Sequence, residues 1–312
     1  YQNDTLTADV EGAGTLTIKS DVILADGKKI GTALDIAKDA SLQAEADQLV
    51  ISDGLSATNG TIKNEGVLTL AGGELKRSVE EGTEDDNVGK VVAAGTDKLT
   101  IGNGVQVSQT IYGGLESGNS NTVDLMINDG SEVLQVIGGQ SATGEANNNT
   151  INIDGRGTVT GLTSGVNQGA VYGGIGQGVI SNNKVNVSGG TFVKNIIGGQ
   201  DNNDSVESTM TNNEITISGG SFAGDIEAVN VKKGVAKQNK VMINDGTFSG
   251  TQILGAEIAE GTGESNIVQI KGGTFNVTDP LIIAGAKGTN GSLTNNSVAI
   301  EDVSNELKAN IY

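Results

Sequence analysis

The chain has 312 residues, with 48 Gly, one Pro and no Cys, His or Trp, and its net charge at pH 7 is −19. The absence of His and Cys excludes Ser-His-Asp and Cys-His catalysis, as well as metal centres built from His or thiolate ligands. Nucleic acid is not an expected partner, because phosphate binding needs clustered Lys and Arg. No apolar run is long enough for a membrane-spanning helix, so we expect no membrane insertion. We also expect no cofactor.

Residues 1–110 carry short segments in which apolar and polar residues alternate, such as GTLTIKSDVIL (14–24) and GTIKNEGVLTLAGGEL (60–75). A period of two residues is typical of a strand with one buried face. Residues 34–50 (LDIAKDASLQAEADQLV) alternate in the same way, and we interpret them as short strands, with a short helix as the alternative. We expect residues 1–110 to form less regular coils of the structure that follows.

Five carboxylates gather within seven residues of the segment EEGTEDD, at Glu80, Glu81, Glu84, Asp85 and Asp86. They are candidate calcium ligands. The segment lacks the fixed Gly and the bidentate Glu of an EF-hand loop, and it also lacks the nonapeptide of calcium-binding β-rolls. A solvated acidic loop is therefore the interpretation that we prefer.

A template recurs in residues 111–312, in which an Asn precedes an alternating strand, a Gly turn, a Phe or Val, and a final Ile or Leu before Gly-Gly. Its copies begin at Asn121, Asn149, Asn183, Asn213, Asn239, Asn266 and Asn296, which are 28, 34, 30, 26, 27 and 30 residues apart. Repeats of 20–50 residues are typical of solenoids, in which each repeat stacks on its neighbours.

One copy of the repeat, NNKVNVSGGTFVKNIIGGQ (182–200), shows what each position contributes. Val185 and Val187 are expected to point inward, whereas Lys184 and Asn186 point outward. The Gly-Gly pair supplies a turn. The only four phenylalanines of the chain occupy the same position in successive repeats, so we predict a stacked ladder in the core made of Phe192, Phe222, Phe248 and Phe275.

Asn doublets precede the first strand of several repeats, as at residues 148–149, 182–183, 212–213 and 295–296. Asn tolerates a left-handed bend, and stacked Asn amides form hydrogen bonds along the stacking direction. We therefore predict a second ladder, outside the core or at a corner, that includes Asn183 and Asn213. The polar segments between Gly-Gly and the next Asn vary in length and are interpreted as loops on one face.

These features predict an all-β, single-stranded parallel β-helix that is continuous from residue 1 to residue 312. Roughly ten to twelve coils, spaced by about 4.8 Å, would form a rod about 50–60 Å long.

The strands GTLTI and GVLTL, together with the NNxVxIxGGxF…IxGG units, resemble the passenger domain of a bacterial autotransporter of the adhesin type. The resemblance implies a right-handed β-helix that is exported across two membranes. It would be displayed outside the cell, attached through a C-terminal barrel beyond Tyr312, or released. It also implies a non-enzymatic adhesin or self-associating protein in cell adhesion and biofilms, whose partners are other copies of itself or a host surface protein or glycan.

Several outward residues are candidates for such contacts. Tyr112 and Tyr172 occupy the position before Gly-Gly in IYGG and VYGG, where each could offer a ring to a partner or instead cap the core at a corner. Lys184, Asn186 and Lys194 are the other candidates. The alternative function is that of a carbohydrate-active β-helix, either a lyase or a hydrolase. That function requires clustered acids with Lys or Arg across adjacent coils.

Overall fold

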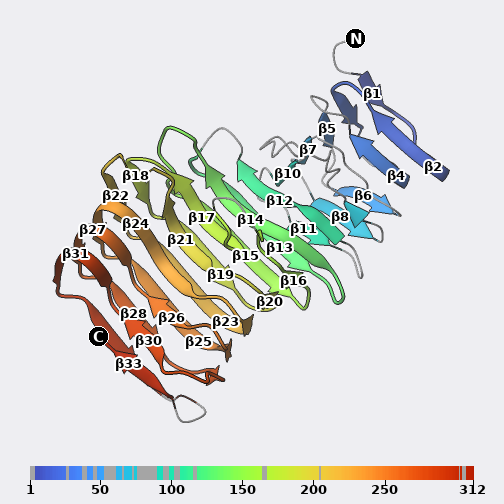
Figure 1. The fold of residues 1–312 in the computed structure, drawn as a ribbon. Coiled ribbons are helices and arrows are strands. Elements are labelled where there is room, and N and C mark those ends of the chain that lie inside the picture. Colours follow the sequence, from blue (N-terminus) through green and yellow to red (C-terminus); the bar gives the residue numbers. More distant parts are fainter. Residues whose placement is uncertain are drawn as a thin grey trace.

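A computed structural model of the chain describes residues 4–25, 28–36, 41–44, 48–52, 61–64, 67–71, 74–75, 90–93, 98–101, 106–114, 118–163, 167–203, 205–301, 303 and 307–312. Every regular element in these ranges is a β-strand. The strands pair in parallel and stack into a β-solenoid of about seven turns (Figure 1). None of the described residues forms a helix that could cross a membrane. The predicted all-β parallel β-helix is confirmed.

Two columns of strands carry most of the repeat. The first column consists of β2 (Val10–Ile18), β4 (Lys29–Ile36), β6 (Gln48–Ser52), β8 (Val67–Ala71), β11 (Lys98–Ile101), β13 (Thr122–Ile127), β15 (Thr150–Gly155), β19 (Lys184–Val187), β23 (Glu214–Phe222), β25 (Lys240–Phe248), β28 (Ile267–Ile270) and β32 (Ser297–Ile300). The second consists of β9 (Glu74–Leu75), β12 (Gln106–Gly114), β14 (Glu132–Gln140), β16 (Thr158–Val159), β20 (Thr191–Phe192), the ends of β23 and β25, and β29 (Thr274–Phe275).

Two further columns complete each coil. The third consists of β1 (Asp4–Leu6), β3 (Val22–Leu24), β5 (Ser41–Ala44), β7 (Thr61–Asn64), β10 (Lys90–Ala93), the ends of β12 and β14, β17 (Val171–Gly176), β21 (Ile196–Asp201), β24 (Ile226–Lys237), β26 (Gln252–Leu254), β30 (Leu281–Ala284) and β33 (Ala309–Ile311). The fourth consists of β18 (Val179–Ser181), β22 (Ser208–Thr211), the end of β24, β27 (Glu257–Glu264) and β31 (Lys287–Thr294).

The sequence predicts ten to twelve coils for the whole chain, and the structure has about seven turns. From β13 onward, the first column supplies one strand to each of the seven repeats that begin with Asn. Its other described strands, β2, β4, β6, β8 and β11, extend the same ladder into residues 1–110. Residues 34–50 contribute to β4, β5 and β6, so their described part is made of strands rather than a helix.

The core is the narrow interior between the columns, and alternation along the first column fills it. In β19 the burial alternates as the sequence predicts, with Val185 0% and Val187 2% exposed, while Lys184 faces solvent. The equivalent pairs in β15, β23 and β25 are also buried, so each coil adds a layer of Val and Ile to one continuous core. Branched aliphatic side chains fill this space with few aromatics, because the interior is only one side chain deep on each side.

The predicted Phe ladder is confirmed. Phe192, Phe222, Phe248 and Phe275 lie at the same register position in the second column, and all are at most 3% exposed. Successive ring centroids are 5.1, 5.0 and 5.0 Å apart, with interplanar angles of 5°, 11° and 17°. The rings stack nearly parallel because the coil spacing fixes their separation.

The Asn ladder also forms, but at a corner inside the protein rather than on its outside. The Nδ2 of Asn183 donates to Asn213 Oδ1 at 2.8 Å and to the carbonyl oxygen of Ala146 at 2.8 Å. The backbone N–H of Asn183 donates to the same Asn213 Oδ1 at 3.1 Å. The same pattern joins all seven repeats through Asn121, Asn149, Asn183, Asn213, Asn239, Asn266 and Asn296. Each amide is thus satisfied without water, as a buried polar group requires.

The two members of each Asn doublet have different roles. The first member bends the chain, and Asn148, Asn182, Asn212 and Asn295 have φ between 56° and 58°. Ser120, Gln238 and Ser265 adopt the same left-handed conformation immediately before the other ladder residues. The second member is the buried ladder Asn. The ladder therefore continues through repeats that have no doublet.

The Gly-Gly pair of the third column is explained by close approach of the coils. A Cβ on Gly173 would lie 2.3 Å from the carbonyl oxygen of Gly198 in the next coil, which is far inside van der Waals contact. The Gly-Gly pair of IxGG lies within the strands of this column, so close packing between coils, rather than a turn, requires it.

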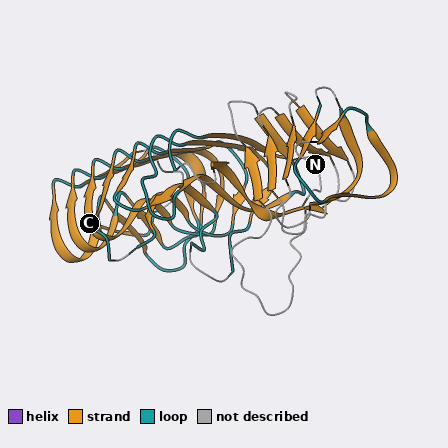
Figure 2. Ribbon diagram, turned by 90° about the horizontal axis from the view of Figure 1, so that it is seen from above, coloured by secondary structure: helices purple, strands orange, loops and turns teal. Residues whose placement is uncertain are grey.

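The segments expected to be loops are partly strands, which corrects the sequence interpretation. The fourth column begins at β18 and continues through β22 and the end of β24. Alternation was hard to detect there because these strands are short and polar. The remaining loops, drawn in teal in Figure 2, run along one edge of the C-terminal half and also emerge near the middle of the solenoid.

Replacing Asn213 with Ala should destabilise the protein strongly. The substitution removes the only acceptor shown for the buried backbone N–H of Asn183, and leaving a buried donor unsatisfied is costly. We expect the free energy of unfolding to fall by about 3 kcal/mol, as measured by urea denaturation. The matched control is Asn244→Ala, because Asn244 is exposed on the surface of β25, and it should change stability by less than about 0.5 kcal/mol. Equal effects of the two substitutions would contradict a structural role of the ladder.

Candidate binding groove and the acid cluster beside it

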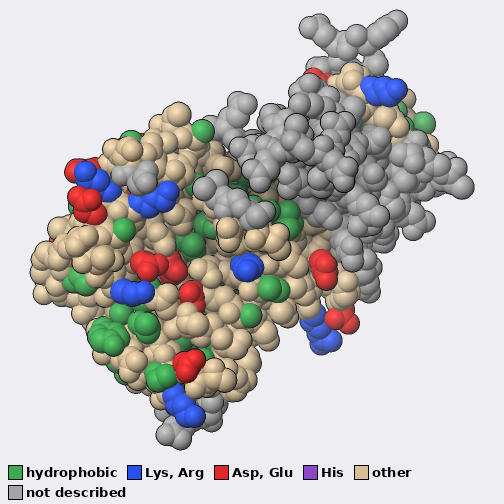
Figure 3. Space-filling view, in the orientation of Figure 1, with side chains coloured by type: hydrophobic (Ala, Val, Ile, Leu, Met, Phe, Trp, Pro, Cys, Tyr) green, Lys and Arg blue, Asp and Glu red, His purple; other side chains and the backbone are tan. Residues whose placement is uncertain are grey.

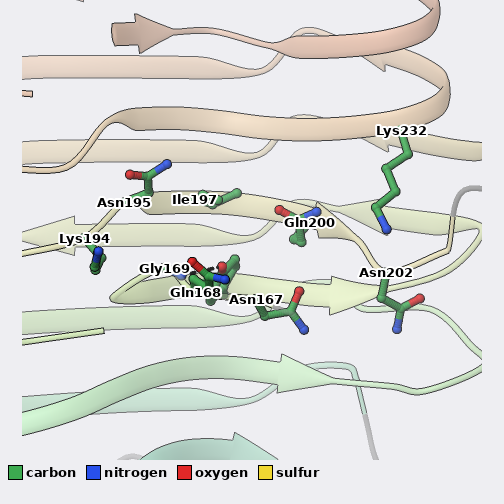
Figure 4. Close-up of a pocket in the computed structure, with 10 residues that line it drawn as sticks. Asn167, Gln168, Gly169, Lys194, Asn195, Ile197, Gln200, Asn202 and Lys232 are labelled. Carbon is green, nitrogen blue, oxygen red and sulfur yellow. Dashed lines mark hydrogen bonds between the residues drawn. The ribbon is translucent and has the colours of Figure 1, made fainter. Parts of the chain in front are cut away.

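A groove with a volume of about 490 Å³ lies on the outer side of the third column, and we call it the outer groove. Its floor is formed by Gly169, Tyr172 and Ile197. Its charged lining residues are Lys194 and Lys232, and its amide lining residues are Asn167, Gln168, Asn195, Gln200 and Asn202. The loops that precede β17 and β21 form one side, and β24 contributes Lys232 from the next coil (Figure 4).

The floor of the outer groove is rigidly held. The backbone N–H of Gly169 donates to the hydroxyl oxygen of Tyr172 at 2.7 Å. The buried side chain of Gln135 donates through Nε2 to the carbonyl oxygens of Asn167 and Gly169, each at 2.7 Å. Burial raises the pKa of Tyr172 to about 12, so its hydroxyl stays neutral. The groove is therefore preformed rather than assembled around a ligand.

The two lysines lie at opposite ends of the outer groove. In Figure 4 the side chain of Lys232 extends toward Gln200 and Asn202, whereas Lys194 lies at the other end, next to Asn195. The amides lie between the two charges. This arrangement offers hydrogen-bond donors and acceptors along the groove and a positive charge at each end.

Two acceptor oxygens at the Lys232 end are buried and have no hydrogen-bond partner, namely Asp201 Oδ2 and Asn202 Oδ1. The Oδ1 of Asp201 accepts from the backbone N–H of Asn203 at 2.9 Å, and Asn202 Nδ2 donates to the carbonyl oxygen of Ser141 at 3.1 Å. Burial raises the pKa of the Asp201 carboxyl, because this side chain is 0% exposed. Unpaired buried acceptors are costly, so these two oxygens are a local source of instability behind this end of the groove.

An acid cluster lies beside the outer groove and spans adjacent coils. Asn195 Nδ2, in the groove wall, lies 3.5 Å from Glu227 Oε1, and Asn230 Nδ2 donates to Glu227 Oε2 at 2.9 Å. Asn230 also donates to Glu257 Oε2 at 3.2 Å, and Glu257 pairs with Lys287 at 3.3 Å. One amide therefore bridges two carboxylates, one of which is neutralised by a lysine.

The carboxyl of Glu227 is the most perturbed group of this cluster. It is 2% exposed, and burial raises its pKa to about 7, with further increases from the negative charges of Glu257 and Asp225. The hydrogen bond from Asn230 and the charge of Lys287 act in the opposite direction. Glu227 is therefore partly protonated at neutral pH, beside an ion-paired Glu257.

The structure places the predicted candidates in different regions. Lys194 lines the outer groove. Tyr172 is 2% exposed and packs with Ile137, Ile175 and Ile197, so the prediction of an exposed ring was wrong and the capping role is correct. Tyr112 packs against the same cluster.

Lys184 and Asn186 lie on β19, in the first column, and do not line the outer groove, which is on the third column. The acidic segment with Glu80, Glu81, Glu84, Asp85 and Asp86 lies outside the described residues. Among the described residues, no group of three or more Asp and Glu side chains could hold a metal ion.

Sequence reasoning missed Glu227, Asp201, Asn202 and Lys232. Glu227 had a detectable signal, because it occupies the position at which the neighbouring coils have Ile197 and Leu254. A carboxylate in an apolar position of a repeat indicates a function or a paired charge. Asn202 and Lys232 had no such signal, because they belong to segments without periodicity.

Comparison of the chain with protein-family models, with curated proteins and with solved structures finds no match in any of the three.

Replacing Glu227 with Gln should remove a specific pH dependence of stability. Because the pKa of Glu227 is raised from 4.5 to about 7, the folded state keeps a proton between these values that the unfolded state loses. Stability from this group is therefore present below about pH 4.5 and is lost as the pH rises through 7. The stability of Glu227→Gln relative to the natural protein should thus increase by on the order of 3 kcal/mol between pH 4 and pH 8. Unfolding by urea across this range measures it, and a pH-independent difference would contradict the assignment.

Proposed function

We propose that this chain is a surface-displayed β-solenoid that mediates attachment between cells, chiefly by associating with other copies of itself. It would act outside a bacterial cell, either attached to the surface or released. The proposal is supported by the solenoid fold, by the resemblance of the repeat to autotransporter passengers, and above all by one surface of the first column. We call this surface the ladder face, and it consists of the outward side chains of β13, β15, β19, β23, β25 and β28.

The ladder face carries a row of alternating charges. Lys184, Glu214 and Lys240 are directly in register on three successive coils. Within the described part of the chain the ion pairs are Lys233–Glu207, Lys237–Glu264 and Lys287–Glu257, and none of them uses these three residues. Their charges are therefore available to a partner.

A second row of uncharged polar residues runs parallel to the charged row. Asn152, Asn186 and Thr216 are in register, and Asn186 Nδ2 donates to Asn152 Oδ1 at 2.8 Å. A shallow hollow with a volume of about 270 Å³ follows this row. On the face seen in Figure 3, the charged side chains of the described residues lie singly or in small groups, and hydrophobic side chains are scattered between them. Many weak polar contacts, rather than one apolar patch, are thus the means of attachment that this surface supports.

Alternation of charge makes the ladder face complementary to itself. A second copy in antiparallel orientation, displaced by one coil, would place a lysine opposite each glutamate, and the coil spacing of about 4.8 Å is the same in both copies. Each contact would be weak because it is exposed. Many copies on two cell surfaces would add their contacts by multivalency.

Reversing the charges of the row should abolish self-association, and mixing two variants of opposite charge should restore association. The double variant Lys184→Glu/Lys240→Glu carries three negative charges in the row, whereas Glu214→Lys carries three positive ones. We expect neither variant to associate with itself, but a mixture of the two to associate. Analytical ultracentrifugation of purified protein and aggregation of cells displaying it would measure this.

The control for charge is the double variant Lys19→Glu/Lys308→Glu, since both lysines are exposed and neither adjoins a strand of the ladder face. It changes the net charge by the same amount and should associate like the natural protein. A natural protein that stays monomeric at high concentration, or a mixture that fails to associate, would count against the proposal.

A second candidate function, a carbohydrate lyase or hydrolase, is favoured by one observation, the acid cluster beside the outer groove. A protonated carboxyl and an ionised one on adjacent coils are what general acid–base cleavage of a sugar uses. Burial raises the pKa of Glu227 to about 7, and Glu257, which pairs with Lys287 at 3.3 Å, lies on the next coil. The burial of Glu227 argues against this candidate, because a glycosidic oxygen would have to reach a side chain that is 2% exposed.

A panel of polysaccharides, assayed for reducing ends and for unsaturated sugars, distinguishes this candidate from adhesion. If adhesion is the function, we expect no turnover of any polymer. Turnover that is abolished by Glu227→Gln or Glu257→Gln, but retained in the charge-reversed variants of the ladder face, would establish the enzyme instead.

A further inference from the structure

We propose that the outer groove binds a carbohydrate that carries an acidic group, such as a uronic or sialic acid residue. The inference adds a ligand class to the adhesion proposed above. It concerns a different surface from the ladder face, so the two can fail independently.

The charge of the groove points to an anion. The chain has 38 acidic and 19 basic residues, yet among the described residues that line the groove there are two lysines and no Asp or Glu. A net charge of −19 repels anions in general. Asp201 and Glu227 lie behind the lining, near Lys232 and Asn195 respectively, but the charges of the lining itself are those of the two lysines.

The amide side chains of the lining point to a ligand that also donates hydrogen bonds. Asn167, Gln168 and Gln200 line the groove, and an amide oxygen accepts hydrogen bonds. A carboxylate alone has no donor to offer, whereas a sugar hydroxyl does. Lys232 extends toward Gln200 and Asn202 in Figure 4, so an anionic group at this end of the groove would meet its ammonium group.

The remaining lining suits a sugar ring. Amide side chains such as Gln200 and Asn195 both donate and accept, which matches the hydroxyls of a saccharide. Tyr172 and Ile197 are buried beneath the lining and give the groove a fixed apolar base. A volume of about 490 Å³ lies within the range of small-molecule sites. An acidic peptide would also meet the lysines, but it would offer few hydroxyls to the amides.

The experiment is a titration of the purified protein, by calorimetry or saturation-transfer NMR, with two pairs of probes. One pair is 3′-sialyllactose and lactose, and the other is trigalacturonate and galactotriose. We expect one acidic member to bind and its neutral counterpart to bind about tenfold more weakly or not at all. The pair that responds identifies the source, either a sialylated glycan or a polyuronate.

Three variants test the assignment of residues. Lys232→Gln and Lys194→Gln should each weaken binding of the acidic probe by about tenfold, because each removes one charge-assisted hydrogen bond. Asn202→Asp keeps the shape of the side chain but adds a negative charge, so it should also weaken binding of the acidic probe. Lys271→Gln, at an exposed site outside the groove, should bind as the natural protein does.

Several outcomes would overturn the inference. These are no binding of either acidic sugar at millimolar concentration, equal binding of the neutral sugars, equal binding of sodium acetate, or binding of triglutamate in place of the sugars. Unchanged thermal midpoints of the variants exclude misfolding as the cause of lost binding. The double variant Lys184→Glu/Lys240→Glu should still bind the probe, which separates a failure of sugar binding from a failure of self-association.

Discussion

The structure depends on a single hydrogen-bonding constraint that is repeated in every coil from Asn121 onward. A buried Asn must donate to the Asn of the next coil, accept from that of the preceding coil, and bind a backbone carbonyl. Only one register satisfies these bonds, because a shift by one residue would place the amide on the other side of the strand. The stacked phenylalanines impose the same register at a second point of the coil. The chain varies outside that span, from the phenylalanine of one coil to the ladder Asn of the next.

The difference between the fixed and the variable parts of each coil explains the positions of the ladder face and the outer groove. The first column is fixed by the ladder on one side and by the phenylalanines on the other, so its outward side chains form a flat and regular array. The third column is followed by segments of variable length, and its outer side is covered by loops that build a groove. Regularity supports repeated weak contact with a similar surface, and irregularity supports recognition of a small molecule. One solenoid thus presents two surfaces with different physical character.

The sequence was informative where a residue repeats and uninformative where it does not. Phe192 and its copies were predicted as a core stack because they share one position and because the chain has no other phenylalanines. The Asn doublets were harder to interpret, since Asn182 and Asn183 differ in conformation, and only the neighbouring coil decides which of them is buried. The groove could not be predicted, because Asn167, Gln168 and Asn202 come from loops that have no period and only the fold brings them to the same surface as Lys194 and Lys232. Tyr172 was ambiguous for the same reason, since its burial depends on the loop at Gly169.

The unequal spacing of the ladder residues has a consequence for how such a protein can change. Successive ladder residues are separated by as few as 26 and as many as 34 positions, yet the amide contacts are equally short. The extra residues of the longest coil lie between β16 and β17, so a coil can gain or lose several residues between its strands without any shift in its neighbours. New surfaces can arise by insertion, one coil at a time, and the same tolerance makes the chain a scaffold into which foreign peptides could be grafted for display.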